Sequence, residues 1–143
     1  MNNLEEFQGD LFSSRNAIGH CVSADMKMTK GIAKVFKKKF GRVEQLKRSG
    51  ARVGDVRALF IDGRWVYYLI TKDMFFMKPS YSTLENALMN MKRHAELEQV
   101  KNIDLPRLGC GLDGLEWSIV KPIINYVFYN SDIKIRIFYI NDN

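Results

Sequence analysis

The chain has 143 residues and a net charge of +6, with 22 lysines and arginines against 16 aspartates and glutamates. Two cysteines and two histidines spread along the chain exclude a disulfide framework and a zinc knuckle, and no apolar run approaches the ~18–20 residues of a membrane span. The acidic N-terminus lacks a signal-peptide pattern, so we expect one intracellular domain over residues 1–143, with an anionic partner indicated by the basic excess.

The first predicted elements are two short apolar stretches, around residues 4–7 and 17–22, which turn-like residues separate. A helix is predicted from about Gly31 to Phe40, because its lysines alternate with apolar residues, and Gly41 ends it. This helix is amphipathic, with a cationic face toward solvent.

The middle of the chain predicts a β-hairpin and then a helix. Apolar runs at residues 56–61 and 65–71 flank Asp62-Gly63, the strongest short-range hairpin signal. In the helix that follows, Ser82 and Glu85 have the spacing of a capping box. Its apolar residues recur at steps of three and four: Tyr81, Leu84, Leu88, Met91 and Ala95.

The last third predicts a short strand at residues 103–108, a helix, and a final alternating strand at residues 133–140. Pro122 within the helical pattern implies a late start or a kink. The apolar residues of this helix are Trp117, Val120, Ile124, Val127 and Phe128. Strands that alternate with helices indicate a layered α/β domain with a mixed sheet.

The basic excess is concentrated between Lys27 and Arg57, where eleven basic and two acidic residues give a net charge of +9. The other 112 residues therefore sum to −3. A solvated helix surface explains this basic segment (residues 27–57), and so does binding to a polyanion. Its phenylalanines fall at core spacing and not as a base-stacking platform. Both interpretations stay open.

The densest motif is the segment 106–114, Pro-Arg-Leu-Gly-Cys-Gly-Leu-Asp-Gly, which follows a predicted strand and leads into a helix. Its glycines allow backbone amides to point at an anion. The three glycines satisfy a dinucleotide-binding fingerprint, but too little chain follows for the βαβ unit that this fingerprint opens. A phosphate-binding loop is therefore favoured. Asp113 fits poorly beside phosphates, and its spacing to Glu116 is that of a helix cap.

Other candidate residues have ordinary structural interpretations as well. A second glycine loop, residues 28–33, begins the basic helix and is predicted to grip a pyrophosphate together with the first. Lys72 ends a predicted strand at the edge of such a crevice, although a lysine there is usually solvated. The remaining candidates are predicted to be reduced thiols, packing or surface histidines and a turn residue: Cys21, Cys110, His20, His94 and Asp10.

Taken together and in order, these blocks resemble the macrodomain family of ADP-ribose-binding modules. The resemblance covers nearly the whole chain. It is carried by segments 9–12, 20–23, 31–33, 36–41, 67–72 and 106–113. The pair Lys72 and Asp113 resembles that of macrodomains acting as terminal ADP-ribose protein glycohydrolases and O-acetyl-ADP-ribose deacetylases. The resemblance implies a three-layer α/β/α fold with a mixed central sheet, and it implies no metal and no cofactor.

The resemblance also implies a role for each residue of the motifs. Lys72 would attack the anomeric carbon of the distal ribose, and Asp113 would act as general acid and base. Asp10 would accept a hydrogen bond from the adenine amino group, with Leu11 beside it, and Ser23 would lie near the distal ribose. The implied substrate-binding set is completed by Gly31, Ile32, Thr71, Pro106, Gly109, Cys110, Gly111 and Leu112.

The implied substrates are ADP-ribose ester-linked to acidic protein side chains and O-acetyl-ADP-ribose. We expect a monomer in the nucleus or the cytoplasm, with DNA damage as a context and no membrane contact. The basic segment would touch poly-ADP-ribose or nucleic acid. The alternatives are a non-catalytic ADP-ribose reader, a nucleic-acid-binding domain and a phosphatase acting on ADP-ribose 1″-phosphate.

Two segments depart from the family pattern. Thr29 and Lys30 stand where related sequences have small residues, so the loop of residues 28–33 is bulkier and carries an extra charge. Residues 73–77 are more apolar than the polar stretch expected there, which predicts a hydrophobic lid or a protein contact. Either departure would change substrate preference without removing Lys72 and Asp113.

Overall fold

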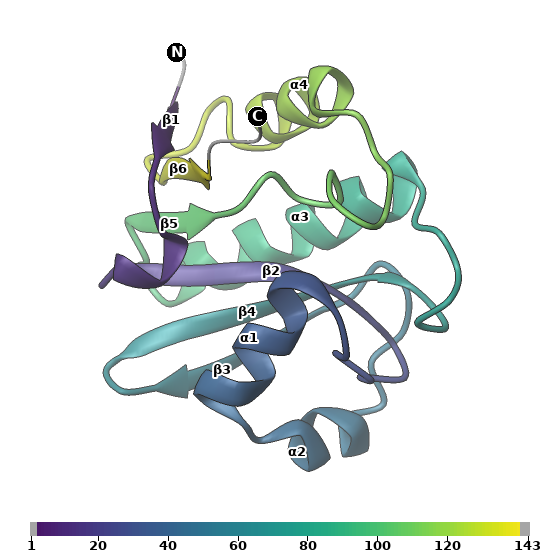
Figure 1. Ribbon diagram of the computed structural model, residues 1–143. Coiled ribbons are helices and arrows are strands. Elements are labelled where there is room, and N and C mark those ends of the chain that lie inside the picture. Colours follow the sequence, from purple (N-terminus) through teal and green to yellow (C-terminus); the bar gives the residue numbers. More distant parts are fainter. Residues whose placement is uncertain (1–2, 141–143) are drawn as a thin grey trace.

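The computed structural model describes residues 3–140, and the ends of the predicted domain, residues 1–2 and 141–143, lie outside the described residues. Its strands are β1 (Leu4–Gln8), β2 (Ala17–Ser23), β3 (Val56–Ile61), β4 (Arg64–Lys72), β5 (Asn102–Leu105) and β6 (Lys134–Tyr139). They form a single sheet in the order β1-β6-β5-β2-β4-β3 (Figure 1). Neighbouring strands are parallel except β3, which is antiparallel to β4, so the predicted mixed sheet is confirmed.

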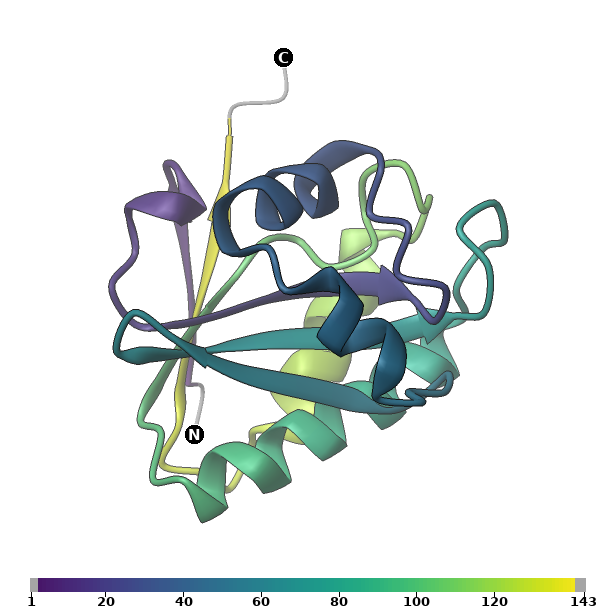
Figure 2. The ribbon, with the colours of Figure 1, turned by 90° about the horizontal axis from the view of Figure 1, so that it is seen from below.

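Helices cover both faces of the sheet, which confirms the three-layer prediction (Figures 1 and 2). They are the 3-10 helix η1 (Leu11–Ser13) and the α-helices α1 (Gly31–Phe40), α2 (Val43–Arg48), α3 (Tyr81–Leu97) and α4 (Trp117–Val127). Phe36 of α1 and Leu46 of α2 belong to the core on one face, and α3 and α4 pack on the other. No helix within residues 3–140 is both long and apolar enough to cross a membrane.

The elements with strong local sequence signals form where they were predicted. α1 has the predicted bounds, and its cationic last turn faces solvent while Phe36 is buried. The hairpin of β3 and β4 turns at Asp62 (φ 53°) and Gly63 (φ 83°), and two successive positive φ angles match the right-handed twist of the strands. The short α2 was not predicted, because Leu46 is its one buried residue and gives no periodic pattern.

The N-terminal cap of α3 is Ser80, so the predicted box of Ser82 and Glu85 is wrong. The Ser80 hydroxyl accepts from the Thr83 amide at 3.0 Å, and the Thr83 hydroxyl oxygen accepts from the Ser80 amide at 3.2 Å. Because α3 begins at Tyr81, Ser82 already lies inside its first turn.

Two boundaries around the glycine motif also differ from the prediction. β5 ends at Leu105 instead of continuing to residue 108, since Pro106 has no N–H to extend the ladder. α4 begins at Trp117 and runs through Pro122, so a late start is wrong. Burial of the apolar face of α4 offsets the hydrogen bond that the proline removes. This face consists of Val120, Ile124 and Val127.

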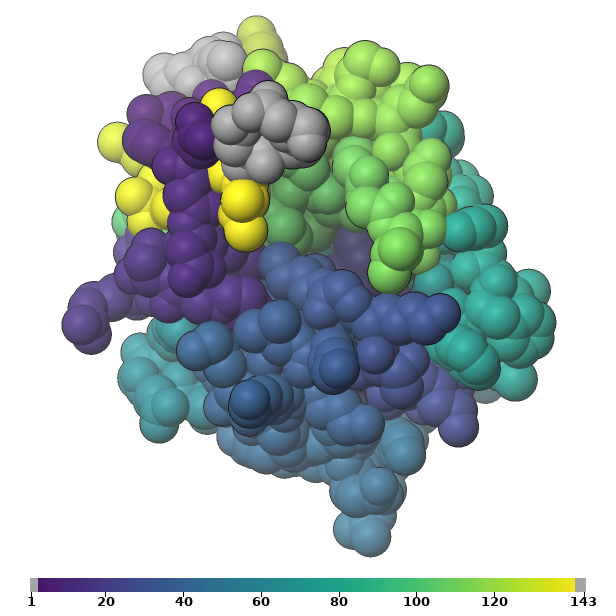
Figure 3. Space-filling view, viewed as in Figure 1, coloured from purple at the N-terminus to yellow at the C-terminus, as the bar shows by residue number. Residues whose placement is uncertain are grey.

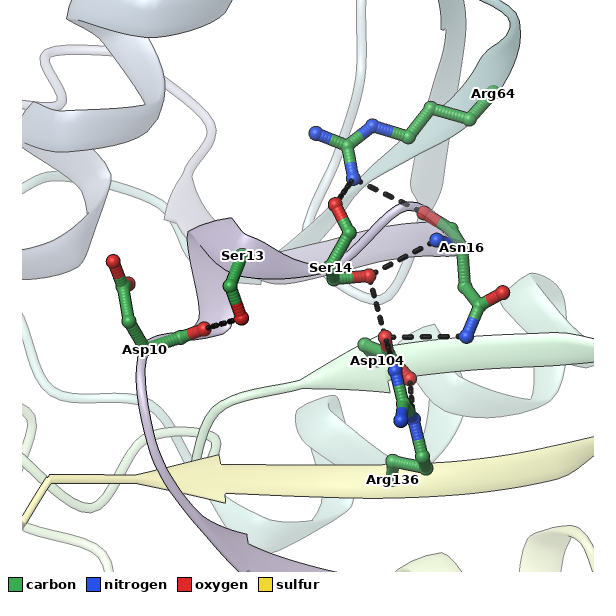
Figure 4. A network of polar contacts seen from close by, with 7 residues as sticks. All are labelled: Asp10, Ser13, Ser14, Asn16, Arg64, Asp104 and Arg136. Carbon is green, nitrogen blue, oxygen red and sulfur yellow. Dashed lines mark hydrogen bonds and ion pairs between the residues drawn. The ribbon is translucent and has the colours of Figure 1, made fainter.

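A buried carboxylate binds the loop between β1 and β2 to the sheet (Figure 4). Asp104 of β5 is wholly buried and accepts from Arg136 Nε at 2.8 Å and Nη2 at 2.6 Å. It also accepts from the Ser14 hydroxyl and from Asn16 Nδ2 at 3.3 Å. Arg64 donates to the backbone oxygens of Ser14 and Asn16 at 2.6 Å and 3.2 Å. The network therefore ties one loop to three strands.

We predict that Arg136→Met lowers the free energy of unfolding by about 3 kcal/mol, because it leaves the Asp104 carboxylate buried without its cation. Urea unfolding measures this change. Lys134→Met on the same strand is the matched control, with an expected change within about 0.5 kcal/mol, since Lys134 is exposed. Equal losses in the two variants would show that the pair does not stabilise the fold.

His20 is a packing residue, as predicted, although it lies within β2 and not after a strand. It is wholly buried, and its ring stacks on that of Phe36 with centroids 3.6 Å apart. Burial lowers the pKa of His20 to about 3 from an ordinary value of 6.5. The imidazole is therefore neutral in the folded protein at neutral pH. His94 also packs, and its Nδ1 hydrogen-bonds the Tyr67 hydroxyl at 2.9 Å.

We predict that acid destabilises the protein through His20. The unfolded chain gains this proton near pH 6.5 and the folded chain only near pH 3, so stability is complete above pH 6.5 and falls as the pH decreases toward 3. The loss from pH 7 to pH 5 is about 2 kcal/mol. His20→Phe keeps a ring on Phe36 and removes the titration, so urea unfolding should show a loss smaller by that amount. An undiminished loss in this variant contradicts the assignment.

Candidate functional site

The carboxyl ends of β2, β4 and β5 meet at one edge of the sheet, because these strands run parallel. The loops that follow them, residues 24–30, 73–80 and 106–116, gather at this edge (Figure 2). They surround a pocket of about 660 Å³, and Figure 3 shows a hollow between the blue α1 and the light green segment after β5. Ligands of open α/β sheets bind at this edge.

The pocket brings together most of the predicted site residues, from segments far apart in the sequence. They are Ser23, Gly31, Ile32, Lys72, Pro106, Gly109, Gly111, Leu112 and Asp113. Parallel pairing explains why these residues lie together, because each strand delivers its last residues to the same edge of the sheet.

The pocket contains a close pair of opposite charges. Lys72 Nζ lies 2.6 Å from Asp113 Oδ1, and the two side chains are 14% and 20% exposed. Asp113 is not a helix cap, since the N-cap of α4 is Glu116, which makes no side-chain capping bond. A cation–carboxylate pair beside the predicted phosphate-binding loops removes the objection that a lone carboxylate would repel phosphates.

A helix N-terminus and a glycine-rich loop form two walls of the pocket. On one wall is the N-terminus of α1, where residues 30–33 line the pocket and the first-turn amides have no intrahelical acceptor. On the other wall is the loop 109–113, closed by the Leu115 amide donating to the Gly109 oxygen at 2.8 Å. Gly109 has φ 70°, and a Cβ there would lie 2.6 Å from Leu115 Cδ1. The chain needs glycine at this turn, and the two walls can bind an anion between them.

Four predicted substrate-binding residues do not line this pocket, and their roles stay predictions. Asp10 caps η1 by accepting from the Phe12 amide at 3.0 Å, as the turn interpretation predicted, and Leu11 is buried in the core below it. Thr71 is buried beside Lys72, and its backbone oxygen accepts from the Thr83 hydroxyl at 2.7 Å. Cys110 points its thiol at the Leu108 oxygen.

The largest part of the lining that the motifs missed is the 73–78 segment after β4. Phe75, Phe76, Met77 and Lys78 all line the pocket, and Phe76 is 69% exposed. The Lys78 ammonium donates to the Leu112 oxygen at 2.7 Å, so the segment touches the opposite wall. The apolar run was noticed in the sequence as a lid or a protein contact. Only the structure shows that it borders the Lys72–Asp113 pair.

Neither cysteine is a ready nucleophile. Cys21, at the pocket, and Cys110, beside it, are both free thiols. Burial raises the pKa of Cys110 to about 11, and burial with the nearby Asp113 carboxylate raises that of Cys21 as well. Both thiols are therefore protonated at neutral pH. Within residues 3–140, no group of three or more His, Cys, Asp or Glu is placed to hold a metal ion.

No family model matches the chain. Individual proteins do. The human ADP-ribose glycohydrolase OARD1 is 44% identical over 133 residues, which are 92% of this chain and 88% of that protein.

Solved structures share the fold, among them one of DarG and one of DarTG. The macrodomain of Thermus aquaticus DarG superposes with a TM-score of 0.86 at 22% identity, over 95% of this chain and 97% of that one. Thermosipho africanus DarTG in complex with ADP-ribose gives 0.85 at 26% identity, over 96% of this chain and 42% of that one. These structures and the human relative together show the family: the chain belongs to the macrodomain family, in the group of the ADP-ribose glycohydrolase OARD1.

Proposed function

We propose that this chain is an ADP-ribose glycohydrolase that releases ADP-ribose ester-linked to acidic side chains and deacylates O-acetyl-ADP-ribose. The observation that carries the proposal is the Lys72–Asp113 pair in a pocket between the N-terminus of α1 and the glycine loop 109–113. The 44% identity to a protein named ADP-ribose glycohydrolase supports the activity. A structural relative in complex with ADP-ribose supports the ligand.

In this proposal the pyrophosphate lies between these two walls, and the distal ribose lies over Lys72. The N-terminus of α1 and the loop 109–112 supply backbone donors, and Lys30 adds a positive charge at the rim. The adenine extends toward Asp10 and Leu11, and Ser23 faces the distal ribose. Pro106, Thr71 and Cys110 support these contacts from the strand ends.

The proposed chemistry uses both members of the pair. Lys72 Nζ passes a proton to Asp113 along their hydrogen bond, which frees the lone pair of the amine. Nζ then attacks the anomeric carbon, the bond from this carbon to the ester oxygen breaks, and the leaving carboxylate takes the proton from Asp113. Asp113 next takes a proton from the water that cleaves the nitrogen–carbon bond. Returning this proton to Lys72 restores the pair and frees ADP-ribose.

We predict that Lys72→Ala and Asp113→Ala each slow the release of ADP-ribose from glutamate-modified protein at least ~100-fold. Each variant removes one partner of the proton transfer. Release is measured with the modified protein as substrate, and calorimetry with free ADP-ribose shows that the pocket is intact. Lys92→Ala on α3, outside the pocket, is the matched control with unchanged release.

Equal release by both variants and wild type would overturn this mechanism. Tight binding of ADP-ribose by a wild-type protein that turns over no ester would favour the second candidate, a non-catalytic reader of ADP-ribose or its polymer. The observation favouring a reader is that Thr29 and Lys30, which are bulkier than the small residues expected there, both line the pocket.

We propose further that the basic segment draws in the anionic object that carries the substrate, a modified protein, poly-ADP-ribose or nucleic acid. Lys37, Lys38 and Lys39 form the last turn of α1 and are exposed, on the helix whose first turn lines the pocket. A cluster of exposed cations raises the local concentration of a polyanion.

Changing these three lysines to glutamine should lower activity on modified protein several-fold at low salt and little at high salt, since ions screen exposed charges. Hydrolysis of O-acetyl-ADP-ribose, which lacks a carrier, should not change. Lys92, Lys101 and Lys134 changed to glutamine are the control set with the same change of charge. Unaltered activity on modified protein at low salt contradicts the role.

We propose the nucleus or the cytoplasm as the compartment of this activity. Both cysteines are free thiols, which suits a reducing environment. A monomeric state and a single domain over residues 1–143 are part of the same proposal.

A further inference from the structure

One carboxylate joins two of the loops that form the pocket. Asp25 lies just after β2, and its Oδ1 accepts from the Ser23 hydroxyl at 2.5 Å and from the Lys27 amide at 3.2 Å. Its Oδ2 accepts from the Phe75 amide at 2.8 Å. One oxygen therefore holds the loop to which Asp25 belongs, and the other holds the 73–78 segment.

The 73–78 segment depends on such polar contacts, because its large side chains are not packed in a core. Met74, Phe75, Phe76 and Met77 are all exposed by between 44% and 69%. The Asp25 amide also donates to the Asp73 oxygen at 3.2 Å, and at the far end Lys78 donates to the Leu112 oxygen. The segment is thus held at both ends, at the loop 24–30 by Asp25 and at the loop 109–113 by Lys78.

The Asp25 carboxylate is ionised in the folded protein at neutral pH. Burial alone raises its pKa, but the hydrogen bonds from Ser23, Phe75 and Lys27 outweigh burial and hold the pKa below its ordinary value of 3.8. The ionised group accepts more strongly on both oxygens than a protonated carboxyl, which carries a hydrogen on one of them, so the charged form holds the two loops together.

We propose that Asp25 is a positioning residue of the hydrolase: its carboxylate fixes the 73–78 segment as the apolar wall beside Lys72 and Asp113. This inference rests on the proposed function, because the wall matters for catalysis only if Lys72 and Asp113 are the reacting pair. The wall limits access of water to the pair, whose side chains are 14% and 20% exposed. A displaced wall would admit water and loosen the near-attack geometry, while the amides that bind the pyrophosphate would stay in place.

The test compares five forms of the full chain: wild type, Asp25→Ala, Asp25→Asn, Phe75→Ala/Phe76→Ala, and this pair combined with Asp25→Ala. Each is assayed for kcat and KM on the ester substrate, for ADP-ribose affinity by calorimetry, and for chymotrypsin cleavage in the 73–78 segment. Asp25→Asn retains the volume and one accepting oxygen, so it serves if Asp25→Ala fails to fold. Asp73→Ala, an exposed carboxylate in the same segment, is the matched control.

We expect Asp25→Ala to lower kcat by roughly 10- to 100-fold with ADP-ribose affinity nearly unchanged, and to speed cleavage of the segment. In the background lacking both phenylalanines, Asp25→Ala should lower kcat no further, because the wall through which it acts is gone. Undiminished kcat, or an equal further loss in that background, overturns the proposal.

Failure of the proposed function is a separate result. It appears as a wild-type protein without turnover, and the cleavage assay still decides the role of Asp25. Equal cleavage of wild type and Asp25→Ala shows that Asp25 does not hold the segment.

Discussion

Parallel pairing of β2 with β4 on one side and with β5 on the other is the constraint on which the site depends. It delivers Ser23, Lys72 and Leu105 to one edge of the sheet, and each strand must then leave through a loop at that edge. The antiparallel hairpin of β3 and β4 could not do this alone, because an antiparallel neighbour sends its end the other way. The pocket is therefore a consequence of strand direction, and the loops supply only its chemistry.

The charges around the pocket are unequal, and this inequality selects the ligand. Lys30, Lys72, Lys78 and Arg107 line the pocket with a single carboxylate, Asp113. Asp113 is paired with Lys72 and Arg107 lies 3.5 Å from Glu6, so Lys30 and Lys78 leave the lining with a net positive charge. The free amides of the first turn of α1 add a directional attraction to this general one. A small ligand with linked phosphates suits both the positive charge and the backbone amides. The more distant exposed lysines of α1 suit a larger polyanion.

Local signals predicted the elements whose causes are local. The hairpin turn needs two positive φ angles, α1 ends at a glycine, and the apolar stripe of α3 repeats along its length, so each is visible in a short window of sequence. The cap of α3 shows the limit, because two serines compete and packing chooses Ser80. Asp104 shows it more strongly. Its partner Arg136 lies on another strand, and no local pattern predicts that a carboxylate between apolar neighbours is wholly buried and paired.

The sequence by itself determined the residue types of the site: two glycine loops, a lysine at a strand end and an aspartate among glycines. It left Asp113 between a helix cap and a functional carboxylate, and the 73–77 run between a lid and a contact surface. Tertiary structure excluded the cap, since Glu116 precedes α4 and Asp113 instead contacts Lys72 at 2.6 Å, across 41 positions, where β4 and the loop after β5 meet. It also placed Phe75, Phe76 and Met77 in the lining of the pocket. It also gave Asp25 its place, because an acceptor has a role only once its donors from other loops lie within hydrogen-bond reach.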